Sequence, residues 1–592
     1  MTVTAPGRPI PPPADFPVRW ANPADARKHW QFEGVHYPDP MTGLEFELMA
    51  TIYGGGMNTA AQVYELPIRV EARQVNTYFY GAVTPLGAPP DVVIRLMLRL
   101  KRVWPGLIEA VEQKAIGGQV ARFLNKLNPV IARLGAYWYE ELLPEVQHYL
   151  TDWQAFDLTA SLADLQAHLE TTLTRARRVG DIHFLIVFPY LLALSQFDDL
   201  YGELFPTAAL FDSYRLLQGF DNKSLAGDRA LWKLSRKAKS LPEVRHILEQ
   251  EPSSQVMAAL SQSATGQIFL EELQAYLAEF GQRGDKFSTI ADVSWLEDPT
   301  PAIKSLKDYM PQPDQDMAAD LAAEAIERER LVAEAREQLQ TQPQAVRDRF
   351  DALLTAAQTA IVIHADHGYW IDYCALYQVR RVLLALGQRL VEGQVITTKS
   401  DLFYLTLAEI KAVTEALLQT QKGPDQRALV AERQAEVAHF RTIRPPAMLG
   451  TMPLAAPPAN PLSRALVKLD GTGPLPATEN GAGLTILQGN GASPGVVRGP
   501  ARIVHSLSQA DKLQAGDILI AGTIAPPWTP LYATVAAVVA ENGGILSHGA
   551  ILAREYRLPA VFGAIAATHH FQDGQIVEVD GTAGTIRLIS AS

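Results

Sequence analysis

One histidine near the C-terminus, His548, stands in a sequence context suited to phosphoryl chemistry. It follows the glycine pair Gly543 and Gly544, a short apolar step and Ser547, and it precedes an amphipathic helical pattern that runs to Glu555. This order predicts an imidazole at a helix N-terminus, where unpaired backbone N–H groups and the helix dipole favour an anion. Neutral imidazole is a nucleophile toward phosphorus. We therefore predict that His548 transiently carries a phosphoryl group.

The residues around His548 have types that would support such a group. Gly543 and Gly544 would let the backbone approach a phosphate closely, and Ser547 is suited to cap the helix or to hydrogen-bond the imidazole. Arg554 is suited to neutralise a phosphoryl oxygen, with a surface ion pair as the equally weighted alternative. A capping or core role is the usual one for any of the 13 histidines, but the surrounding motif favours chemistry at His548.

Ordered blocks from about residue 489 onward resemble the swivelling phosphohistidine domain of the phosphoenolpyruvate-utilising enzymes. These blocks cover residues 492–501, 516–519, 527–531, 543–548, 553–556, 558–561, 573–574 and 579–581. The resemblance implies a compact α/β domain in which His548 is the phosphoryl acceptor. It also implies that Thr529, in a proline-rich turn, faces this histidine.

Looser blocks earlier in the chain resemble the substrate-binding domain of rifampin phosphotransferase and the large subunit of phenylphosphate synthase. They cover residues 30, 36–38, 76–80, 280–284, 295–299, 380–387 and 400–406. Arg283 and Arg380 lie in these blocks and are candidates for holding the phosphoryl group or the substrate. Structural ion pairing is the alternative for both arginines.

A hydroxyl acceptor would need a general base, for which His36, His364 and His367 are the candidates. His364 and His367, with Asp366 between them, also have the composition of a metal site. On a helix, however, they would need further inward-facing ligands that the sequence does not identify, so we predict no metal.

Composition is typical of a soluble protein with two to four domains. The chain has 592 residues, of which 47% are hydrophobic and 20% charged. Its net charge of −12 argues against nucleic-acid binding. The single cysteine, Cys374, precludes an intrachain disulfide, and the most apolar run, residues 184–194, is too short to span a bilayer and contains Pro189. No secretory signal is apparent, so we expect a cytoplasmic protein that does not bind membranes.

The order of patterns predicts an α+β multidomain fold. We expect a loose arm over residues 1–15 and a mainly helical substrate-binding domain over 16–444, with a small mixed α/β part at about 16–90. Strands are predicted at 63–70 and 77–80, and helices at 92–103, 162–178, 317–340 and 347–360. A Pro/Gly-rich linker is predicted over 445–484. The swivelling phosphohistidine domain follows over 485–592, with strands at 501–505, 518–521, 537–540, 575–579 and 585–589.

Several modules of the family are not recognisable in this sequence. There is no ATP-grasp opening, no Gly-x-x-x-x-Gly-Lys-Ser/Thr loop and no room for a phosphoenolpyruvate-binding barrel. The resemblance therefore implies a separate ATP-grasp partner that binds Mg²⁺ with ATP and loads His548. The acceptor would be a hydroxyl of a small molecule, for example an aromatic one. The alternative is a non-enzymatic phosphocarrier or regulatory protein that is switched by phosphorylation of His548.

Overall fold

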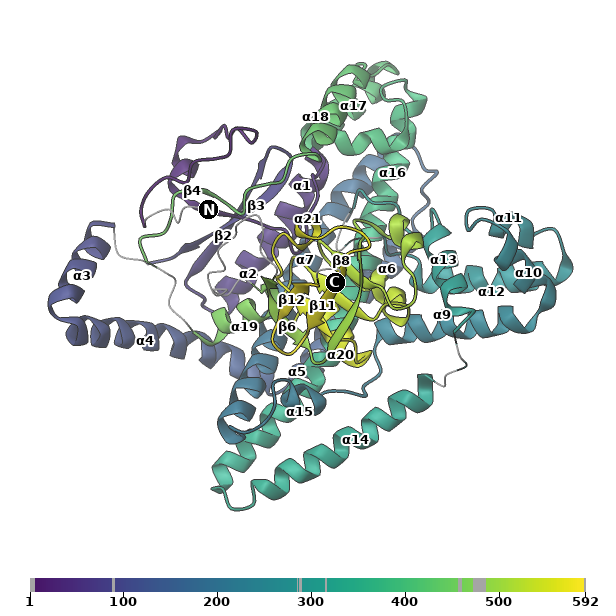
Figure 1. Ribbon diagram of the computed structural model, residues 1–592. Helices are drawn as coiled ribbons and strands as arrows, with labels where there is room; N and C mark the ends of the chain where they lie inside the picture. Colours follow the sequence, from purple (N-terminus) through teal and green to yellow (C-terminus); the bar gives the residue numbers. More distant parts are fainter. Residues whose placement is uncertain are drawn as a thin grey trace. The chain divides into compact units, whose positions relative to one another are not determined.

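The computed structural model describes residues 6–87, 91–284, 286, 290–312, 314, 317–455, 460–471 and 486–589 (Figure 1). They divide into two compact units, each discontinuous in sequence. The first unit comprises residues 1–189 and 378–461, and the second comprises 190–377 and 462–592. This division differs from the expected single helical domain over 16–444, because residues 190–377 join the C-terminal region.

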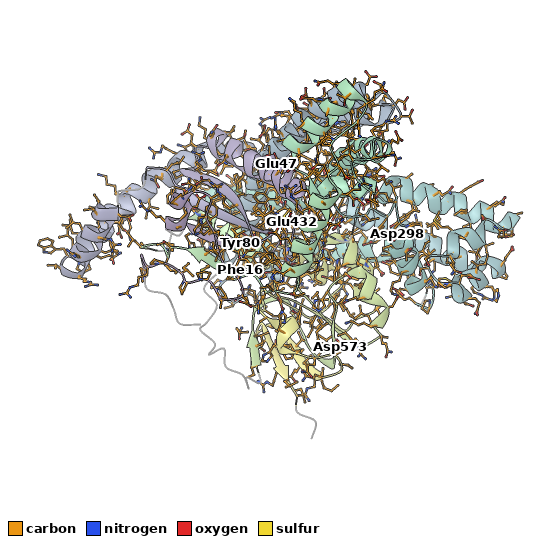
Figure 2. The ribbon with its side chains drawn as sticks, turned by 90° about the horizontal axis from the view of Figure 1, so that it is seen from above. Phe16, Glu47, Tyr80, Asp298, Glu432 and Asp573 are labelled. Atoms are coloured by element: carbon orange, nitrogen blue, oxygen red, sulfur yellow. The ribbon has the colours of Figure 1, made fainter. Side chains whose placement is uncertain are left out.

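The first unit contains a four-stranded antiparallel sheet in the order β2-β3-β1-β4. Its strands are β1 (His29–Phe32), β2 (Ile68–Val75), β3 (Tyr78–Pro85) and β4 (Met448–Gly450). Aromatic residues on one face form its core, in which the rings of Phe16 and Tyr80 lie 6.3 Å apart (Figure 2). The strand predicted at 63–70 is wrong in its first half, because Val63 ends helix α2 (Gly55–Val63) and β2 begins only at Ile68.

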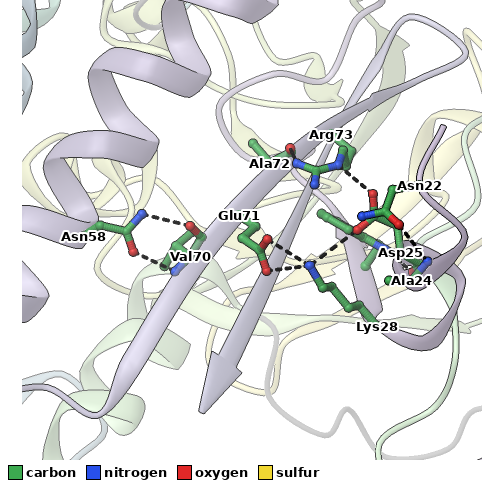
Figure 3. A network of polar contacts seen from close by, with 10 residues as sticks. Asn22, Ala24, Asp25, Lys28, Asn58, Val70, Glu71, Ala72 and Arg73 are labelled. Carbon is green, nitrogen blue, oxygen red and sulfur yellow. Dashed lines mark hydrogen bonds and ion pairs between the residues drawn. The ribbon is translucent and has the colours of Figure 1, made fainter. Parts of the chain in front are cut away.

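A polar network fastens the N-terminal segment to β2 (Figure 3). Lys28 Nζ lies 2.7 Å from a carboxylate oxygen of Glu71 and 3.3 Å from Asp25 Oδ1. Arg73 Nε donates to Asp25 Oδ2 at 2.8 Å. Because Asp25 is buried and shared by two cations, these bonds hold its pKa below the usual range despite burial, which acts in the opposite direction.

The segment predicted to be a loose arm is ordered in part. Gly7 N–H donates to Met452 O at 3.0 Å, and Ile10 N–H donates to Gly450 O at 2.8 Å. Residues 7–10 thus extend the pairing next to β4, and the expectation of a loose arm is wrong for them. A proline-rich segment can pair in this way at a sheet edge, where a missing N–H costs little.

Helices make up the rest of the first unit. They are η1 (Pro23–Arg27), α1 (Gly43–Met49), η2 (Ala50–Gly54), α2, α3 (Asp91–Val103), α4 (Pro105–Ile131), α5 (Leu134–Ala136), η3 (Tyr137–Leu142), α6 (Leu143–Ala155), the first part of α7 (Leu162–Leu204), most of α16 (Leu376–Glu392), η5 (Lys399–Tyr404), α17 (Leu407–Thr420) and α18 (Arg427–Phe440). The helices predicted at 92–103 and 162–178 are confirmed.

Helix α7 is continuous through Pro189, which the sequence suggested would interrupt it. A proline within a helix leaves the carbonyl four residues earlier without its N–H donor. Here the Tyr64 hydroxyl donates to that carbonyl, Leu185 O, at 2.5 Å. By length and composition α7 is the one described helix that could cross a membrane, yet 83% of its most apolar window is buried within the protein, as in the core helices of soluble proteins.

Residues 190–377 of the second unit are mainly helical, and we call them the helical module. It contains the end of α7, α8 (Asp212–Arg215), α9 (Lys223–Ser240), α10 (Pro242–Gln250), α11 (Val256–Leu260), α12 (Ala264–Phe280), α13 (Thr300–Tyr309), α14 (Met317–Gln338), α15 (Gln344–His367) and η4 (Gly368–Ala375). Helices α14 and α15, predicted at 317–340 and 347–360, form a hairpin that is visible in Figure 1, and an Arg336–Asp351 ion pair of 2.8 Å joins them.

The rest of the second unit is an α/β module, residues 486–589, which we call the histidine module. Its eight strands follow the order β5-β12-β11-β7-β8-β9-β10-β6. They are β5 (Ile486–Gln488), β6 (Asn490–Ser493), β7 (Val496–Ile503), β8 (Ile518–Ala521), β9 (Ala537–Ala540), β10 (Ala560–Phe562), β11 (Ile576–Asp580) and β12 (Thr585–Leu588). Strands β7 to β10 are parallel. β8 and β9 are entirely buried, which fits their unbroken apolar sequences.

Short helices connect these strands: η6 (Leu507–Lys512), η7 (Pro526–Ala533), α20 (His548–Glu555) and α21 (Ala567–His570). α20 joins the parallel strands β9 and β10 in a β-α-β unit. A continuous apolar cluster contains residues from both modules, including Leu231 and Leu306 of the helical module and Trp528 and Leu531 of the histidine module. This shared core explains why the two modules form one compact unit.

The segment predicted to be a linker, residues 445–484, contains two ordered elements. β4 pairs with β1 of the first unit, and α19 (Pro461–Asp470) belongs almost wholly to the second. Residues 456–459 and 472–484 of the predicted linker lie outside the described residues. The prediction of a structureless linker is therefore wrong for these two elements.

Candidate functional site

His548 is the first residue of α20, directly after the loop that leaves the carboxyl end of β9. In open α/β sheets, ligands bind at the carboxyl ends of parallel strands. Ser547 occupies the N-cap position, but its hydroxyl donates to Gly544 O at 2.7 Å and makes no cap hydrogen bond. The serine thus holds the loop, and the predicted capping bond is absent.

The two glycines before His548 allow α19 to approach. A side chain on Gly544 would lie 2.3 Å from Lys468 O and 2.7 Å from Gly471 N, and Gly543 has a φ of +99°. The Gly544 N–H donates to Leu469 O at 2.7 Å. The close approach that we expected from a phosphate is thus made here by backbone at the end of α19. A phosphate-binding role for Gly543 and Gly544 stays a prediction.

Arg554 is buried, so the alternative of a surface ion pair is wrong. Its guanidinium donates to Ala492 O and Ile545 O, each at 2.8 Å, and lies 4.4 Å from the Tyr214 ring centroid. Burial lowers the pKa of Arg554. Arg554 fastens the loop that carries His548, and its predicted contact with a phosphoryl group is untested.

Thr529 is buried in η7, the turn that follows β8. In the same turn, the Tyr532 hydroxyl donates to Gly549 O at 3.0 Å. The carboxyl ends of β8 and β9 therefore supply two neighbouring segments, η7 and the start of α20, as the resemblance implied. Whether Thr529 supports a phosphoryl group stays a prediction.

The His548 imidazole meets two histidines of α15. Its ring centroid lies 6.0 Å from that of His364, with the ring planes only 12° apart, and the His364 and His367 centroids are 6.1 Å apart. Burial, together with the charges of His367 and Arg283, lowers the pKa of His548 to about 3. Burial also lowers the pKa of His364 well below its usual value. His548 is therefore neutral at physiological pH, the form that attacks phosphorus.

The protonation of His367 follows from its hydrogen bond. Its Nδ1 lies 2.9 Å from Ile363 O, and a carbonyl oxygen only accepts, so Nδ1 carries a proton and donates it to this oxygen. The Tyr190 ring lies 5.1 Å from His367 and 5.5 Å from His364. Asp366 accepts from the Lys223 N–H at 2.9 Å, which directs a carboxylate oxygen to the start of α9.

Arg283 supplies positive charge near His548. Its Nε donates to Phe280 O at 2.9 Å, and its guanidinium lies 4.8 Å from the Trp295 ring centroid. A side chain on Gly227 would meet Arg283 Nη2 at 2.7 Å, so only glycine leaves room for the guanidinium at this point of α9. These contacts hold a buried cation in place, which is the arrangement needed to neutralise a developing phosphoryl charge.

A cavity of about 20 Å³ lies beside His548 and His364. Its lining is mostly apolar and comes from the loop before α9, from the first turn of α9, from α15 and from α20: Leu217, Phe220, Asn222, Ser224, Leu225, Ile361, Val362, His364, Ala365, His548, Ile551, Leu552 and Glu555. The loop is clamped, because Arg328 donates to Gln218 O at 2.8 Å and lies 3.8 Å from the Phe220 ring centroid. This space holds roughly one water molecule, so a larger ligand requires its walls to move apart.

Two predicted site residues belong to the first unit. His36 is about 40% exposed there, and its Nδ1 lies 2.8 Å from Glu33 Oε1. Arg380 is buried on α16, with its guanidinium 5.3 Å from the Phe403 ring centroid. The structure groups Arg283, His364 and His367 with His548 in the second unit, whereas His36 and Arg380 belong to the first. The roles of these last two residues stay predictions.

Two carboxyl groups of the second unit were missed by sequence reasoning. Asp228 on α9 is buried, and burial raises its pKa to about 7 although the charge of Arg283 opposes this. Glu555 lines the pocket, and burial together with the charge of Glu324 raises its pKa to about 8. The acidic residue at the end of α20 was visible in the sequence, but its burial depends on α14, which is distant in sequence.

The raised pKa of Glu555 predicts that the free energy of unfolding falls as pH rises from about 4.5 to about 8. The folded protein keeps a proton on Glu555 that the unfolded chain releases above about pH 4.5, so the stabilisation is complete below that pH and is lost as pH rises toward 8. We expect Glu555→Gln to remove this loss, which amounts to roughly 3–5 kcal/mol at most. Urea unfolding across this pH range measures it. Glu337→Gln, on the exposed part of α14, is the matched control and should follow the wild type. Equal pH profiles for Glu555→Gln and wild type would contradict the assignment.

Comparisons with known proteins match both modules of the second unit. A family model described as the rifampicin phosphotransferase fourth domain matches residues 186–363, which include Arg283. A model described as the mobile domain of PEP-utilising enzymes matches residues 513–584, which include Thr529 and His548.

Similar proteins extend the match to nearly the whole chain. Chondramide synthase of Chondromyces crocatus is 37% identical over 99% of this chain, which spans 14% of that protein. An uncharacterized phosphotransferase of Bacillus subtilis is 30% identical over 69% of this chain and 47% of its own length. Rifampicin phosphotransferase of Streptomyces sviceus is 29% identical over 59% of this chain and 38% of its own length. The chain thus spans less than half the length of each of these relatives.

Proposed function

Because this chain belongs to the family of PEP-utilising enzymes, we propose that it is a phosphotransferase that carries a phosphoryl group on His548 and delivers it to an acceptor hydroxyl. The observation that supports this most is the neutral imidazole at the start of α20, next to the buried Arg283 charge, the α15 histidines and the pocket. A phosphorylated His548 would meet a cation, a base and an acceptor site together.

Two displacements make up the proposed reaction. In the first, a nitrogen of His548 attacks the donor phosphorus, an N–P bond forms, and the P–O bond to the donor's leaving group breaks. In the second, the acceptor oxygen attacks the same phosphorus and the N–P bond breaks, which returns a neutral imidazole. The acceptor proton passes to an α15 histidine, His364 or His367. Arg283 stabilises charge on the transferring oxygens, so catalysis is mostly positioning and electrostatics.

The donor side of the proposal rests on the family. A separate ATP-grasp protein would bind ATP with Mg²⁺ and transfer the β-phosphoryl group to His548, and water would take up the γ-phosphoryl group, so that AMP and phosphate are left. A loaded His548 would then dock at the helical module. The chain's own residues would bind the acceptor and hold the phosphoryl group.

The pocket indicates the class of acceptor. Leu217, Phe220, Leu225 and Ile361 present apolar walls, with the histidines at one end. Once these walls move apart, a small hydroxylated molecule with an apolar, aromatic body would contact them and direct its hydroxyl at His548. We therefore propose a phenol or an apolar alcohol as the acceptor.

Labelled ATP tests this function. The full chain is incubated with ATP labelled in the β or the γ phosphoryl group, with and without a lysate of the source cells. We expect acid-labile label on the protein only from β-labelled ATP and only with the lysate, and its release by phenols or apolar alcohols into a stable ester. Label that forms but is released by no acceptor would instead favour a regulatory phosphocarrier. No label from ATP or from phosphoenolpyruvate would overturn the proposal.

A further inference from the structure

The contact between the two modules of the second unit is apolar at its centre. Trp528 and Tyr532 of η7 share one buried cluster with Leu231 of α9 and Leu306 of α13. Around this cluster, Lys304 Nζ lies 3.2 Å from Asp511 Oδ1. The exposed ion pair contributes little to the free energy of docking, so the position of His548 depends mainly on the buried part of this contact.

Three enclosed polar atoms interrupt the apolar contact: Asp228 Oδ2, the Tyr309 hydroxyl and the Tyr556 hydroxyl. Asp228 and Tyr309 lie on α9 and α13 with 3% and 2% of their side chains exposed, while Tyr556 ends α20 in the histidine module. None of the three atoms has a partner of good hydrogen-bond geometry among the residues that the structure describes. Buried polar groups are rarely left without a hydrogen-bond partner, because each such group keeps the full free-energy cost of its desolvation.

Electrostatic interactions connect the three groups. The Tyr556 hydroxyl interacts with the Asp228 carboxyl and lowers its pKa, while burial, the larger effect, raises it. Tyr556 also interacts with the Tyr309 hydroxyl, whose pKa burial raises. A phenol hydroxyl both donates and accepts, so Tyr556 alone can bridge an acceptor and a donor on the opposite module.

Tyr556 is also connected to the start of α20. Its ring meets that of Tyr532 edge to face, with centroids 5.8 Å apart and planes at 88°. The Tyr532 hydroxyl donates to Gly549 O at 3.0 Å, on the residue next to His548. A bond made at Tyr556 therefore fixes the helix that presents the imidazole.

We propose that Asp228, Tyr309 and Tyr556 form a latch that holds the histidine module against the helical module with His548 at the acceptor pocket. A small side-chain adjustment lets the Tyr556 hydroxyl donate to the Asp228 carboxylate and accept from the Tyr309 hydroxyl. These are positioning residues, which touch neither the phosphoryl group nor the acceptor. The latch rests on the proposed function in one respect. Release of the histidine module matters only if His548 must leave the acceptor pocket to be phosphorylated elsewhere.

Chemical modification of His548 measures the open fraction without any phosphoryl transfer. Diethyl pyrocarbonate acylates accessible imidazoles, and the docked His548 is only 9% exposed. Tryptic peptide 513–554 contains His548 as its sole histidine, so mass spectrometry of the full chain follows this residue alone. The exposed His505 and His439 serve as internal references in the same sample.

We expect Tyr309→Phe to speed acylation of His548 by about three- to tenfold, the effect of losing one net hydrogen bond, and Tyr556→Phe, which loses two, to speed it further. The rate increase in the double variant should be smaller than the product of the two single increases, because both single variants lose the bond between Tyr309 and Tyr556. Tyr149→Phe, which removes a hydroxyl bonded to Glu145 in the first unit, is the matched control and should leave the rate unchanged.

Two results would overturn the latch. The first is an unchanged His548 rate in Tyr556→Phe. The second is a rise shared equally by His505 and His439, which reports general loosening. The proposed function fails separately, in the labelling experiment, because acylation needs neither donor nor acceptor.

Discussion

Replacing His548 by asparagine should abolish phosphoryl incorporation and lower turnover by at least about 10⁴-fold, since no other group can form the covalent intermediate. Asparagine keeps a polar side chain of modest size at the start of α20, so the helix should form normally. Incorporation is followed by mass at alkaline pH, and folding by the unfolding temperature.

The matched control for this variant is His505→Asn. His505 is an exposed histidine of the same module, and its replacement should leave incorporation intact. Full incorporation in His548→Asn would assign the phosphoryl group to another residue and contradict the proposed mechanism.

Replacing Arg283 by alanine should slow discharge of phosphorylated His548 to the acceptor by about 10²- to 10³-fold, the usual effect of removing one group that stabilises transition-state charge. Loading of His548 should change little, because it takes place on the donor partner. A single-turnover experiment that starts from the phosphorylated protein separates the two half-reactions.

Arg283 also packs against Trp295 and bonds to Phe280 O, so loss of folding has to be separated from loss of charge. Arg283→Lys keeps the charge and loses the planar fork, and its discharge rate should lie between those of wild type and Arg283→Ala. Equal discharge rates in all three proteins, with equal unfolding temperatures, would remove Arg283 from the mechanism.

Local sequence was sufficient to predict the two strands β8 and β9, in which every residue is buried. β8 and β9 occur at the predicted residues because short apolar runs bounded by turn residues have few alternatives in a parallel sheet. The start of α20 at His548 also follows from its local pattern. β6 and β10 were not predicted, because each has only three or four residues and gains its stability from pairing with distant strands.

Contacts between residues distant in sequence determine α19, the continuity of α7 and the division into units, which local sequence patterns did not predict. Proline-rich flanks concealed α19, whose last turn meets Gly544 through a backbone approach that no local pattern encodes. Pro189 predicts a break in α7, yet the Tyr64 hydroxyl satisfies the carbonyl that the proline leaves open. The division into units depends on the apolar cluster shared by α9, α13 and η7.

The sequence was sufficient to single out His548, but it predicted fewer of the residues that surround it. The glycine pair and Ser547 identified His548, the family resemblance suggested Arg283, and residue type suggested His364 and His367. Asp228 carried no such signal, because its position near Tyr556, which is distant in sequence, arises only when the two modules meet. For Arg554 the alternatives were a phosphoryl contact and a surface ion pair, since burial of a charge on carbonyl oxygens cannot be inferred from spacing.

The central claim is that His548 carries the phosphoryl group, and site-localised mass spectrometry at alkaline pH tests it most directly. The full chain is incubated with ATP and the lysate of the source cells, digested, and analysed without exposure to acid. The account predicts a phosphoryl group on the imidazole of His548 in peptide 513–554, lost after brief acid treatment. An acid-stable phosphoryl group on a serine, threonine or tyrosine of that peptide, or none on the peptide under any donor, would contradict it.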